Sequence, residues 1–132
     1  MIHLNTSVLI DALTGARRSA PALRAAIGLG ERLVLSSLVL YEWRRGPRIG
    51  PELDAQEALF PSESAVPFDA AAAVQAAALY ATLKRPRGRE IDLAIAACAL
   101  VQGALLWTLN REDFSDVPAL VLYDPSSPNI GI

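Results

Sequence analysis

The stretch that decides the fold is Met1-Ile2-His3-Leu4-Asn5-Thr6-Ser7-Val8-Leu9-Ile10-Asp11, at the start of the chain. Its apolar residues 2–4 predict a short strand, and the three polar residues that follow all favour the N-cap of a helix. Val8, Leu9 and Ile10 then continue with helical spacing. The stretch therefore predicts a strand, a turn and a helix in immediate succession.

The same alternation runs through the rest of the chain. Periodicity and capping residues predict helices over residues 19–27, 38–45, 51–59, 70–83 and 89–102. Short apolar runs bounded by turn residues predict strands over residues 32–35, 64–68, 105–108 and 120–122. The strand over 64–68 should lie at an edge, because Pro67 cannot donate a ladder hydrogen bond. Short strands that alternate with helices need crossover connections, so we predict an α/β fold with a mostly parallel sheet and helices on both faces.

Composition predicts one folded domain over residues 1–132. Hydrophobic residues make up 52% of the 132 residues and charged residues 20%, which argues against disorder. No apolar run approaches the roughly 20 residues of a membrane span, and the N-terminus lacks the features of a signal peptide. We therefore expect a cytoplasmic protein. The single cysteine, Cys98, lies in an Ala/Leu run and is expected to be a small buried hydrophobe.

The net charge of −2 argues against a protein that grips nucleic acid by bulk positive charge. The basic residues nevertheless gather in short groups. They are Arg17 and Arg18, then Arg44, Arg45 and Arg48, and finally Lys84, Arg85, Arg87 and Arg89. Each group is either a set of solvated helix ends or part of a basic rim beside an acidic pocket, and the sequence favours neither.

Asp92 is the carboxylate that is hardest to explain as a surface residue. Every other residue over 91–101 is apolar, so this helix should be largely buried. A buried carboxylate without a partner costs on the order of several kcal/mol. Asp92 must therefore cap the helix, pair with a cation, stay protonated or bind a metal.

Further polar residues stand in unexpected places. Glu42 is surrounded by apolar and aromatic residues just after the second strand, and a surface pair with Arg44 or Arg45 would contribute only about 0–1 kcal/mol. Asn110 and Asp113 follow the strand 105–108, where they either cap a short helix or belong to a site.

In an open α/β sheet, ligands bind beyond the carboxyl ends of the strands, which is where all of these residues and the turn after the first strand are expected. Carboxylates held close together repel one another, and a hard dication relieves that repulsion while it accepts oxygen ligands. The sequence therefore predicts a site for Mg²⁺, with Mn²⁺ as a second possibility. One His and one Cys in the whole chain argue against zinc.

These segments together resemble the motifs of the PIN-domain family, and specifically its VapC-like toxins, over essentially the full chain. The first motif is residues 1–11. The others are Ser36-Ser37-Leu38-Val39-Leu40-Tyr41-Glu42, Arg89-Glu90-Ile91-Asp92-Leu93-Ala94-Ile95-Ala96-Ala97 and Thr108-Leu109-Asn110-Arg111-Glu112-Asp113-Phe114. The resemblance implies a three-layer PIN-like fold and a metal-dependent endoribonuclease of a type II VapBC toxin–antitoxin system. It also implies a structured RNA substrate such as tRNA or rRNA, a homodimer and a small VapB-like antitoxin.

The resemblance places the catalytic, metal-binding positions of the family at Asn5, Glu42, Asp92 and Asp113. Residues that support the ligands or the substrate are expected at Thr6, Asn110 and Arg89. Apolar residues that would line an antitoxin groove or a dimer face, or simply belong to the core, are Leu23, Ile27, Tyr41, Trp43, Leu53 and Leu59.

Asn5 departs from the family, which has Asp at this position. An amide offers a neutral oxygen in place of an anionic one, so metal affinity and activity should be reduced or abolished in this form, whether the Asn is natural or engineered. The alternative function is a non-catalytic PIN module that binds RNA or protein. Other phosphoryl-transfer domains fit less well, since the turn after the first strand carries neither paired acids nor a Gly-rich loop ending in Gly-Lys.

Overall fold

Three short parallel strands form the sheet at the centre of the computed structural model, which describes residues 1–126. β1 (Ile2–Leu4) lies in the middle, between β2 (Leu33–Val34) and β3 (Leu105–Trp107). Ile2 pairs with Leu33 on one side and with Leu105 on the other. The predicted α/β class with a parallel sheet is confirmed.

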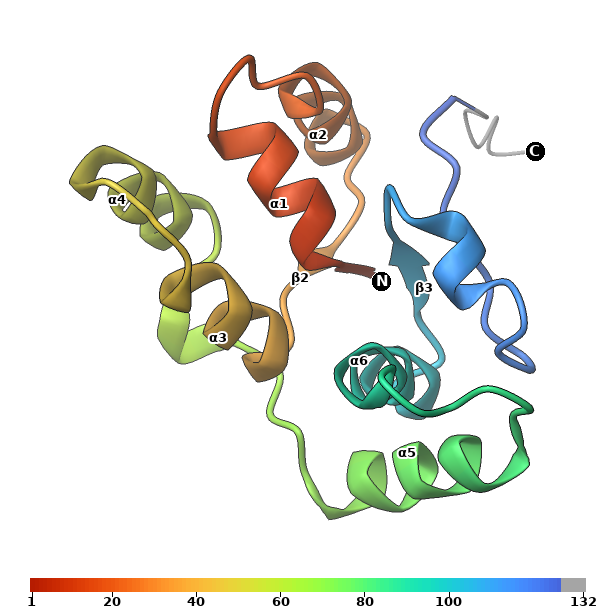
Figure 1. The fold of residues 1–132 in the computed structure, drawn as a ribbon. Coiled ribbons are helices and arrows are strands. Elements are labelled where there is room, and N and C mark those ends of the chain that lie inside the picture. The colour runs from red at the N-terminus through yellow and green to blue at the C-terminus, as the bar shows by residue number, and fades with distance from the viewer. Residues whose placement is uncertain (127–132) are drawn as a thin grey trace.

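Helices cover both sides of this sheet. They are α1 (Thr6–Leu13), α2 (Ala20–Gly28), α3 (Ser37–Arg45), α4 (Gly50–Leu59), α5 (Ala70–Thr82) and α6 (Glu90–Val101). Two single turns of 3₁₀-helix complete the described elements, η1 (Ser62–Ser64) and η2 (Arg111–Phe114). Figure 1 shows α1 and α2 on one side of the sheet and α5 and α6 on the other, as right-handed crossovers in a β2-β1-β3 sheet require.

Polar side chains start several of these helices. Asn5 caps α1 by accepting a hydrogen bond from the backbone N–H of Thr6, at 2.9 Å. Ser36 caps α3 and Asp69 caps α5, each through the backbone N–H three residues on. Because α1 and α3 begin directly after β1 and β2, their capping residues lie at the carboxyl ends of these strands.

Two of the predicted strands, over residues 64–68 and 120–122, are wrong, because each segment makes only an isolated bridge. Residues 62–64 form η1, and only Val66 pairs with the central part of the fold, through a single parallel bridge to Ser36. Pro67 lacks the N–H that would extend this ladder. Leu122 likewise makes one parallel bridge to Leu106, in an extended stretch bounded by Ala119, at a φ of 65°, and by Pro125.

The core is centred on α6, where residues 93–99 are all buried. The helix contacts α5, α3, β3 and η2, so it connects most of the fold. Cys98 is buried within it, and desolvation together with the negative charge of Asp69 raises the pKa of its thiol to about 11. The thiol is therefore neutral near pH 7 and packs as a small hydrophobe, as predicted. None of the helices in residues 1–126 combines the length and apolar character that crossing a membrane requires.

His3 occupies the middle of the central strand, with only 1% of its surface exposed. Its Nε2 lies 2.6 Å from Oε1 of Gln102, an atom that only accepts hydrogen bonds, so Nε2 carries the proton. Nδ1 is buried without a partner. Burial lowers the pKa of His3, the hydrogen bond to Gln102 opposes that shift, and the N-terminal ammonium lowers the pKa further.

We expect the stability of the protein to fall as the pH drops below about 6.5, the ordinary pKa of histidine. Between the lowered pKa of folded His3 and that value, the unfolded chain binds a proton that the folded chain does not, so acid favours unfolding. Urea unfolding at about pH 7.5 and about pH 5.5 measures this difference. Since His3 is the only histidine, the His3→Leu variant should lose most of it. An unchanged pH dependence in that variant would assign the effect to other groups.

Candidate active site at the carboxyl edge of the sheet

The carboxyl ends of the three parallel strands lie along one edge of the sheet, and a polar residue follows each of them closely. Asn5 comes directly after β1 and Thr108 directly after β3, while Ser36 comes two residues after β2. The backbone N–H of Asn5 donates to the carbonyl of Trp107 at 2.8 Å, which joins the ends of β1 and β3. This edge is where the sequence predicted a site.

Asn5 is held at both ends of its side chain and is only 4% exposed. Its Oδ1 accepts from the backbone N–H of Thr6, which can only donate, and this contact fixes the orientation of the amide. Its Nδ2 donates to Oγ1 of Thr108 at 2.8 Å. The Thr108 hydroxyl also accepts from the backbone N–H of Asn110 at 3.0 Å, so it connects Asn5 to the turn that leads to Asp113.

Thr108 is buried and Ser7 is half-buried, and both belong to this hydrogen-bond network. The sequence did not single out either of them as a site residue. The Ser7 hydroxyl accepts from the backbone N–H of Leu109 at 3.1 Å and lies 3.4 Å from the Thr108 hydroxyl. The only signal in the sequence is position, since each residue falls in the first polar turn after a buried strand. A hydroxyl there is common in capping turns and does not by itself indicate a site.

Glu42 extends from α3 toward the start of α1. The Thr6 hydroxyl donates to its Oε1 at 2.6 Å, and Nη2 of Arg45 lies 3.7 Å from its Oε2. The surface pair with Arg45 that the sequence left open is therefore present, but the shorter contact is to Thr6. The carboxylate of Glu42 is thus held beside the first turn of α1. Thr6, which holds it, directly follows Asn5 in the chain.

Asp92 is half-buried near the N-terminus of α6. Burial raises the pKa of its carboxyl, the negative charges of Glu42 and Asp113 raise it further, and the positive charge of Arg89 opposes them. The structure therefore brings both Glu42 and Asp113 within electrostatic reach of Asp92, although the three residues come from separate elements. Ionised together, these carboxylates repel one another.

The types of side chain gathered here decide whether a metal ion could bind to them. Within residues 1–126, no group of three or more His, Cys, Asp or Glu side chains is already assembled around a common point. The chemistry of the donors nevertheless suits a hard dication, because Glu42, Asp92, Asp113 and the amide of Asn5 offer only oxygen ligands. Burial and, after it, the charges of Glu42 and Asp113 raise the pKa of Asp92, and a bound cation would offset both effects.

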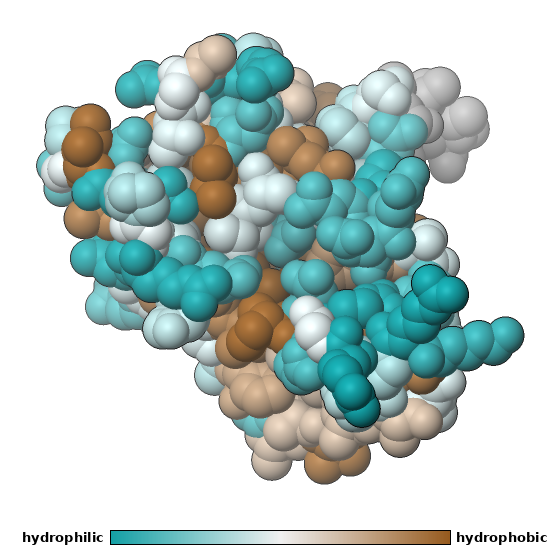
Figure 2. All heavy atoms as spheres, in the orientation of Figure 1, coloured by the Kyte–Doolittle hydropathy of each residue, from teal (hydrophilic) through white to brown (hydrophobic). Residues whose placement is uncertain are grey.

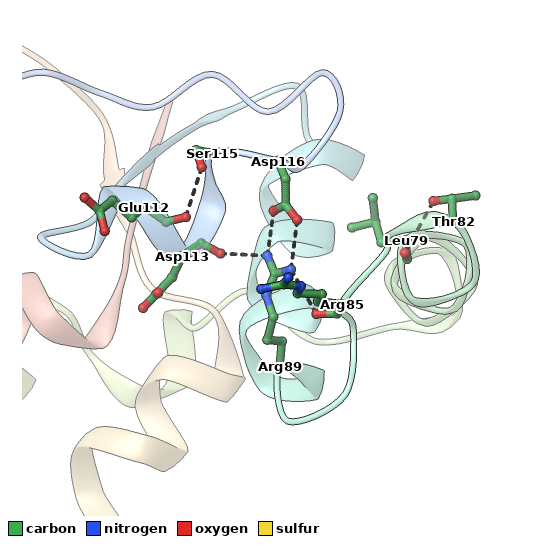
Figure 3. A network of polar contacts seen from close by, with 8 residues as sticks. All are labelled: Leu79, Thr82, Arg85, Arg89, Glu112, Asp113, Ser115 and Asp116. Carbon is green, nitrogen blue, oxygen red and sulfur yellow. Dashed lines mark hydrogen bonds and ion pairs between the residues drawn. The ribbon is translucent and has the colours of Figure 1, made fainter.

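Arg89 makes the densest set of polar contacts near this site (Figure 3). Its two terminal nitrogens donate to the carboxylate of Asp116 at 2.7 and 2.9 Å. The guanidinium also donates to the backbone carbonyls of Asp113, at 2.8 Å, and of Arg85, at 3.2 Å. In Figure 3 the side chain of Asp113 points away from the guanidinium, so only its carbonyl is engaged. Arg89 therefore fastens η2 to the start of α6.

Asp116 is a residue that sequence reasoning missed. The contact with Arg89 lowers the pKa of its carboxyl and raises the pKa of the guanidinium. The pair is bidentate, which is the stronger geometry for arginine and a carboxylate. Asp116 follows a polar turn in which any acid would look solvated, so its residue type gave no signal.

Asn110 is exposed, and its side chain makes no hydrogen bond within residues 1–126. Its carbonyl accepts from the backbone N–H of Asp113 at 3.0 Å, which starts η2. Asn110 and Asp113 both line a shallow hollow over η2. The side chain is thus open to solvent beside Asp113.

A separate apolar groove of about 300 Å³ lies between α1, α2 and α4. It is lined by Ala12, Leu13, Arg17, Ala20, Leu23, Arg24, Ile27, Pro51, Glu52, Ala55 and Leu59. Figure 2 shows hydrophobic side chains between α1 and α4. Of the residues proposed from sequence for a groove, Leu23, Ile27 and Leu59 line this one. Trp43 is completely buried in the core instead, and Tyr41 is exposed on α3 beneath the guanidinium of Arg45.

Comparisons with known proteins agree with this architecture. A family model described as the PIN domain matches residues 2–120. VapBC2 from Rickettsia felis, solved bound to a DNA fragment from its promoter, is 24% identical with a TM-score of 0.76, over 93% of this chain and 98% of that one. DNA-bound VapBC from Salmonella typhimurium is 22% identical with a TM-score of 0.78, over 94% and 97%.

A toxin–antitoxin complex from Klebsiella pneumoniae is 25% identical with a TM-score of 0.72, over 95% of this chain and 98% of that one. Among curated proteins, no sequence matches significantly. The family model spans nearly the whole described chain, and the resemblance seen in the four sequence motifs is confirmed. This protein belongs to the PIN domain family.

Proposed function

We propose that this protein is a VapC-like toxin that cleaves structured RNA, such as tRNA or rRNA, with the help of Mg²⁺ or Mn²⁺. The observation that carries the proposal is that the negative charges of Glu42 and Asp113 both act on the half-buried Asp92 in a PIN fold. Burial raises the pKa of the Asp92 carboxyl, and the negative charges of Glu42 and Asp113 raise it further. PIN domains are generally nucleases, and such a carboxylate set is what phosphodiester hydrolysis with a metal requires.

In this proposal Glu42, Asp92 and Asp113 hold the cation, and Asn5 contributes a neutral oxygen at the fourth position. The metal, when bound, supplies an activated water and neutralises the charge that develops on the scissile phosphate. Thr6 orients Glu42 by donating to Oε1, which leaves Oε2 free to turn from Arg45 toward a ligand. Arg89 holds the backbone of Asp113 in place, and Asn110 lies beside it in the open hollow.

A non-catalytic PIN module that binds RNA or protein is the second candidate. It is favoured by Asn5, which removes one negative charge from the site. It is also favoured because no three His, Cys, Asp or Glu side chains within residues 1–126 are gathered as metal ligands would be. The two functions differ in what a divalent cation should do. Only the nuclease needs one.

Incubation with total tRNA and with rRNA tests the proposal. We expect discrete fragments with Mg²⁺ or Mn²⁺ and none with EDTA, because without a cation the three carboxylates repel the phosphate. Fragments that form equally well in EDTA would reject the metal-dependent mechanism. RNA that is bound but stays intact under every metal condition would favour the non-catalytic module.

We further propose that the groove between α1, α2 and α4 receives an apolar segment of a VapB-like antitoxin, and that the toxin forms a homodimer. Ile27 and Leu59 line the groove with 46% and 44% of their surfaces exposed. Apolar residues so exposed beside a groove are typical of helix-in-groove binding. Arg17 and Arg24 lie at the same groove and suit acidic residues on the partner.

Ile27→Asp should weaken antitoxin binding by about a hundredfold or more, because it places an unpaired charge in an apolar contact. The measurement is co-purification with the short protein that we expect the adjacent gene to encode, followed by calorimetry. Val74→Asp is the matched control, since Val74 is 71% exposed on α5, a helix that does not line this groove. Equal binding by both variants would place the antitoxin elsewhere.

A further inference from the structure

Two shallow hollows meet at the candidate active site. One, of about 400 Å³, is lined by Leu109, Asn110, Arg111, Glu112 and Asp113. The other, of about 550 Å³, is lined by Lys84, Arg85, Arg89, Glu112, Asp113, Ser115 and Asp116. Because both are lined by Glu112 and Asp113, they adjoin there. A depression thus leads from Asp113 to the basic loop between α5 and α6.

Two cations at the far end of this depression have no role in the fold. Lys84 and Arg85 are exposed, and within residues 1–126 their side chains make no hydrogen bond or ion pair. Figure 2 shows strongly hydrophilic side chains gathered over the loop between α5 and α6 and over η2. An exposed cation without an internal partner is free to bind an anion.

The basic residues of α3 differ in this respect. Arg44 binds Gln56 and lies near Glu57, while Arg45 lies near Glu42 and over the ring of Tyr41. Their charges are already engaged within the chain. The group of basic residues on α3 therefore offers less to a ligand than the loop does.

Arg89 fixes the position of the basic loop between α5 and α6 relative to Asp113. It donates to the carbonyl of Arg85 and to the carbonyl of Asp113, so one guanidinium joins the two walls of the depression. Its own charge is paired with Asp116 in a bidentate contact. Arg89 thus acts as a tie between the walls, and the unpaired positive charge comes from Lys84 and Arg85.

We propose that Lys84 and Arg85 bind backbone phosphates of the RNA next to the phosphate that is cleaved. The proposal rests on the proposed function and adds the path of the strand, from the acidic site across η2 to the basic loop. Glu112 and Asp113 line this path and repel a polyanion, so cations at its end help to hold one. RNA supplies evenly spaced phosphates that reach both ends of such a depression.

Binding of fluorescently labelled total tRNA, followed by anisotropy over a range of salt concentrations, tests the proposal. Asp92→Asn is present in every protein to prevent cleavage. The Lys84→Ala/Arg85→Ala double variant should bind about tenfold more weakly or worse, and its salt slope should shrink by about one per lost phosphate contact. Arg32→Ala is the control, because Arg32 is also exposed, its side chain makes no hydrogen bond or ion pair within residues 1–126, and it directly precedes β2 at the opposite edge of the sheet. It should leave both quantities unchanged.

With Asp92 restored, the double variant should raise KM for tRNA cleavage with little change in kcat, since it removes binding and not chemistry. If the double variant matches Arg32→Ala in affinity and salt slope, the proposal is overturned. Loss of antitoxin binding with normal tRNA binding would also overturn it, in favour of a protein interface. If the unaltered protein does not cleave tRNA but the double variant still binds tRNA more weakly, the proposed nuclease function is rejected and the phosphate-binding role stands.

Discussion

Asp92→Asn is expected to abolish RNA cleavage and at the same time to stabilise the fold. The substitution removes an anionic ligand while it keeps the shape of the side chain, so the loss of activity should exceed about 100-fold, the upper range for a residue that only supports a ligand. The carboxylate it removes is half-buried and repelled by Glu42 and Asp113, which is why its pKa is raised. Without a metal, the ionised form of Asp92 therefore destabilises the folded protein at neutral pH.

The sign of this effect can be checked by pH. Because the pKa of Asp92 is higher in the folded chain than in the unfolded one, its protonation favours folding, and the advantage of Asn over Asp should shrink as the pH falls through that range. Cleavage of total tRNA and thermal unfolding in EDTA are the two measurements. Asp54→Asn makes the same chemical change at an exposed position on α4 and serves as the control. If the two variants cleave equally, Asp92 is not part of the site.

Asn5→Asp is expected to raise Mg²⁺-dependent cleavage by about tenfold or more, since it places an anionic oxygen at the fourth position of the proposed metal site. The surroundings of Asn5 can accept the change. Thr6 still donates its backbone N–H, and the Thr108 hydroxyl, which accepts from Asn5 at present, can rotate and donate to a carboxylate. We therefore expect the fold to persist.

The same variant should become dependent on the metal for its stability. A carboxylate at this buried position is desolvated and adds negative charge next to Thr6, which holds Glu42, so the melting temperature in EDTA should fall below that of the unaltered protein. Mg²⁺ should raise it again, and by more than it raises the unaltered protein. Asp92→Ala in this background should abolish cleavage.

Asn110→Asp is the matched comparison for Asn5→Asp. It adds the same charge nearby, but on a side chain that is exposed and has no partner within residues 1–126. Equal gains in cleavage from both variants would show that the effect is general electrostatics. If Asn5→Asp changes neither the cleavage rate nor the response of the melting temperature to Mg²⁺, Asn5 is not part of the metal site.

Much of the local structure could be predicted from the sequence because it depends on neighbours in the chain. Asn5 caps α1 through the next residue, and α6 is buried along residues 93–99 because its sequence is apolar on all sides. Predictions failed where pairing with distant residues was needed. The segment 64–68 has the composition of a strand, yet Pro67 and the turn η1 leave it only one bridge.

The sequence by itself determined the α/β class, the strand ends at which polar residues would gather, and the carboxylates that a fold could not easily bury. These properties follow from periodicity and capping, which act over a few residues. Only the tertiary structure decided that Thr6 holds Glu42, that Asn5 reaches Thr108 and that Asp116 neutralises Arg89. Such contacts join segments far apart in the chain, and desolvation and charge coupling depend on distances in space that no local pattern encodes.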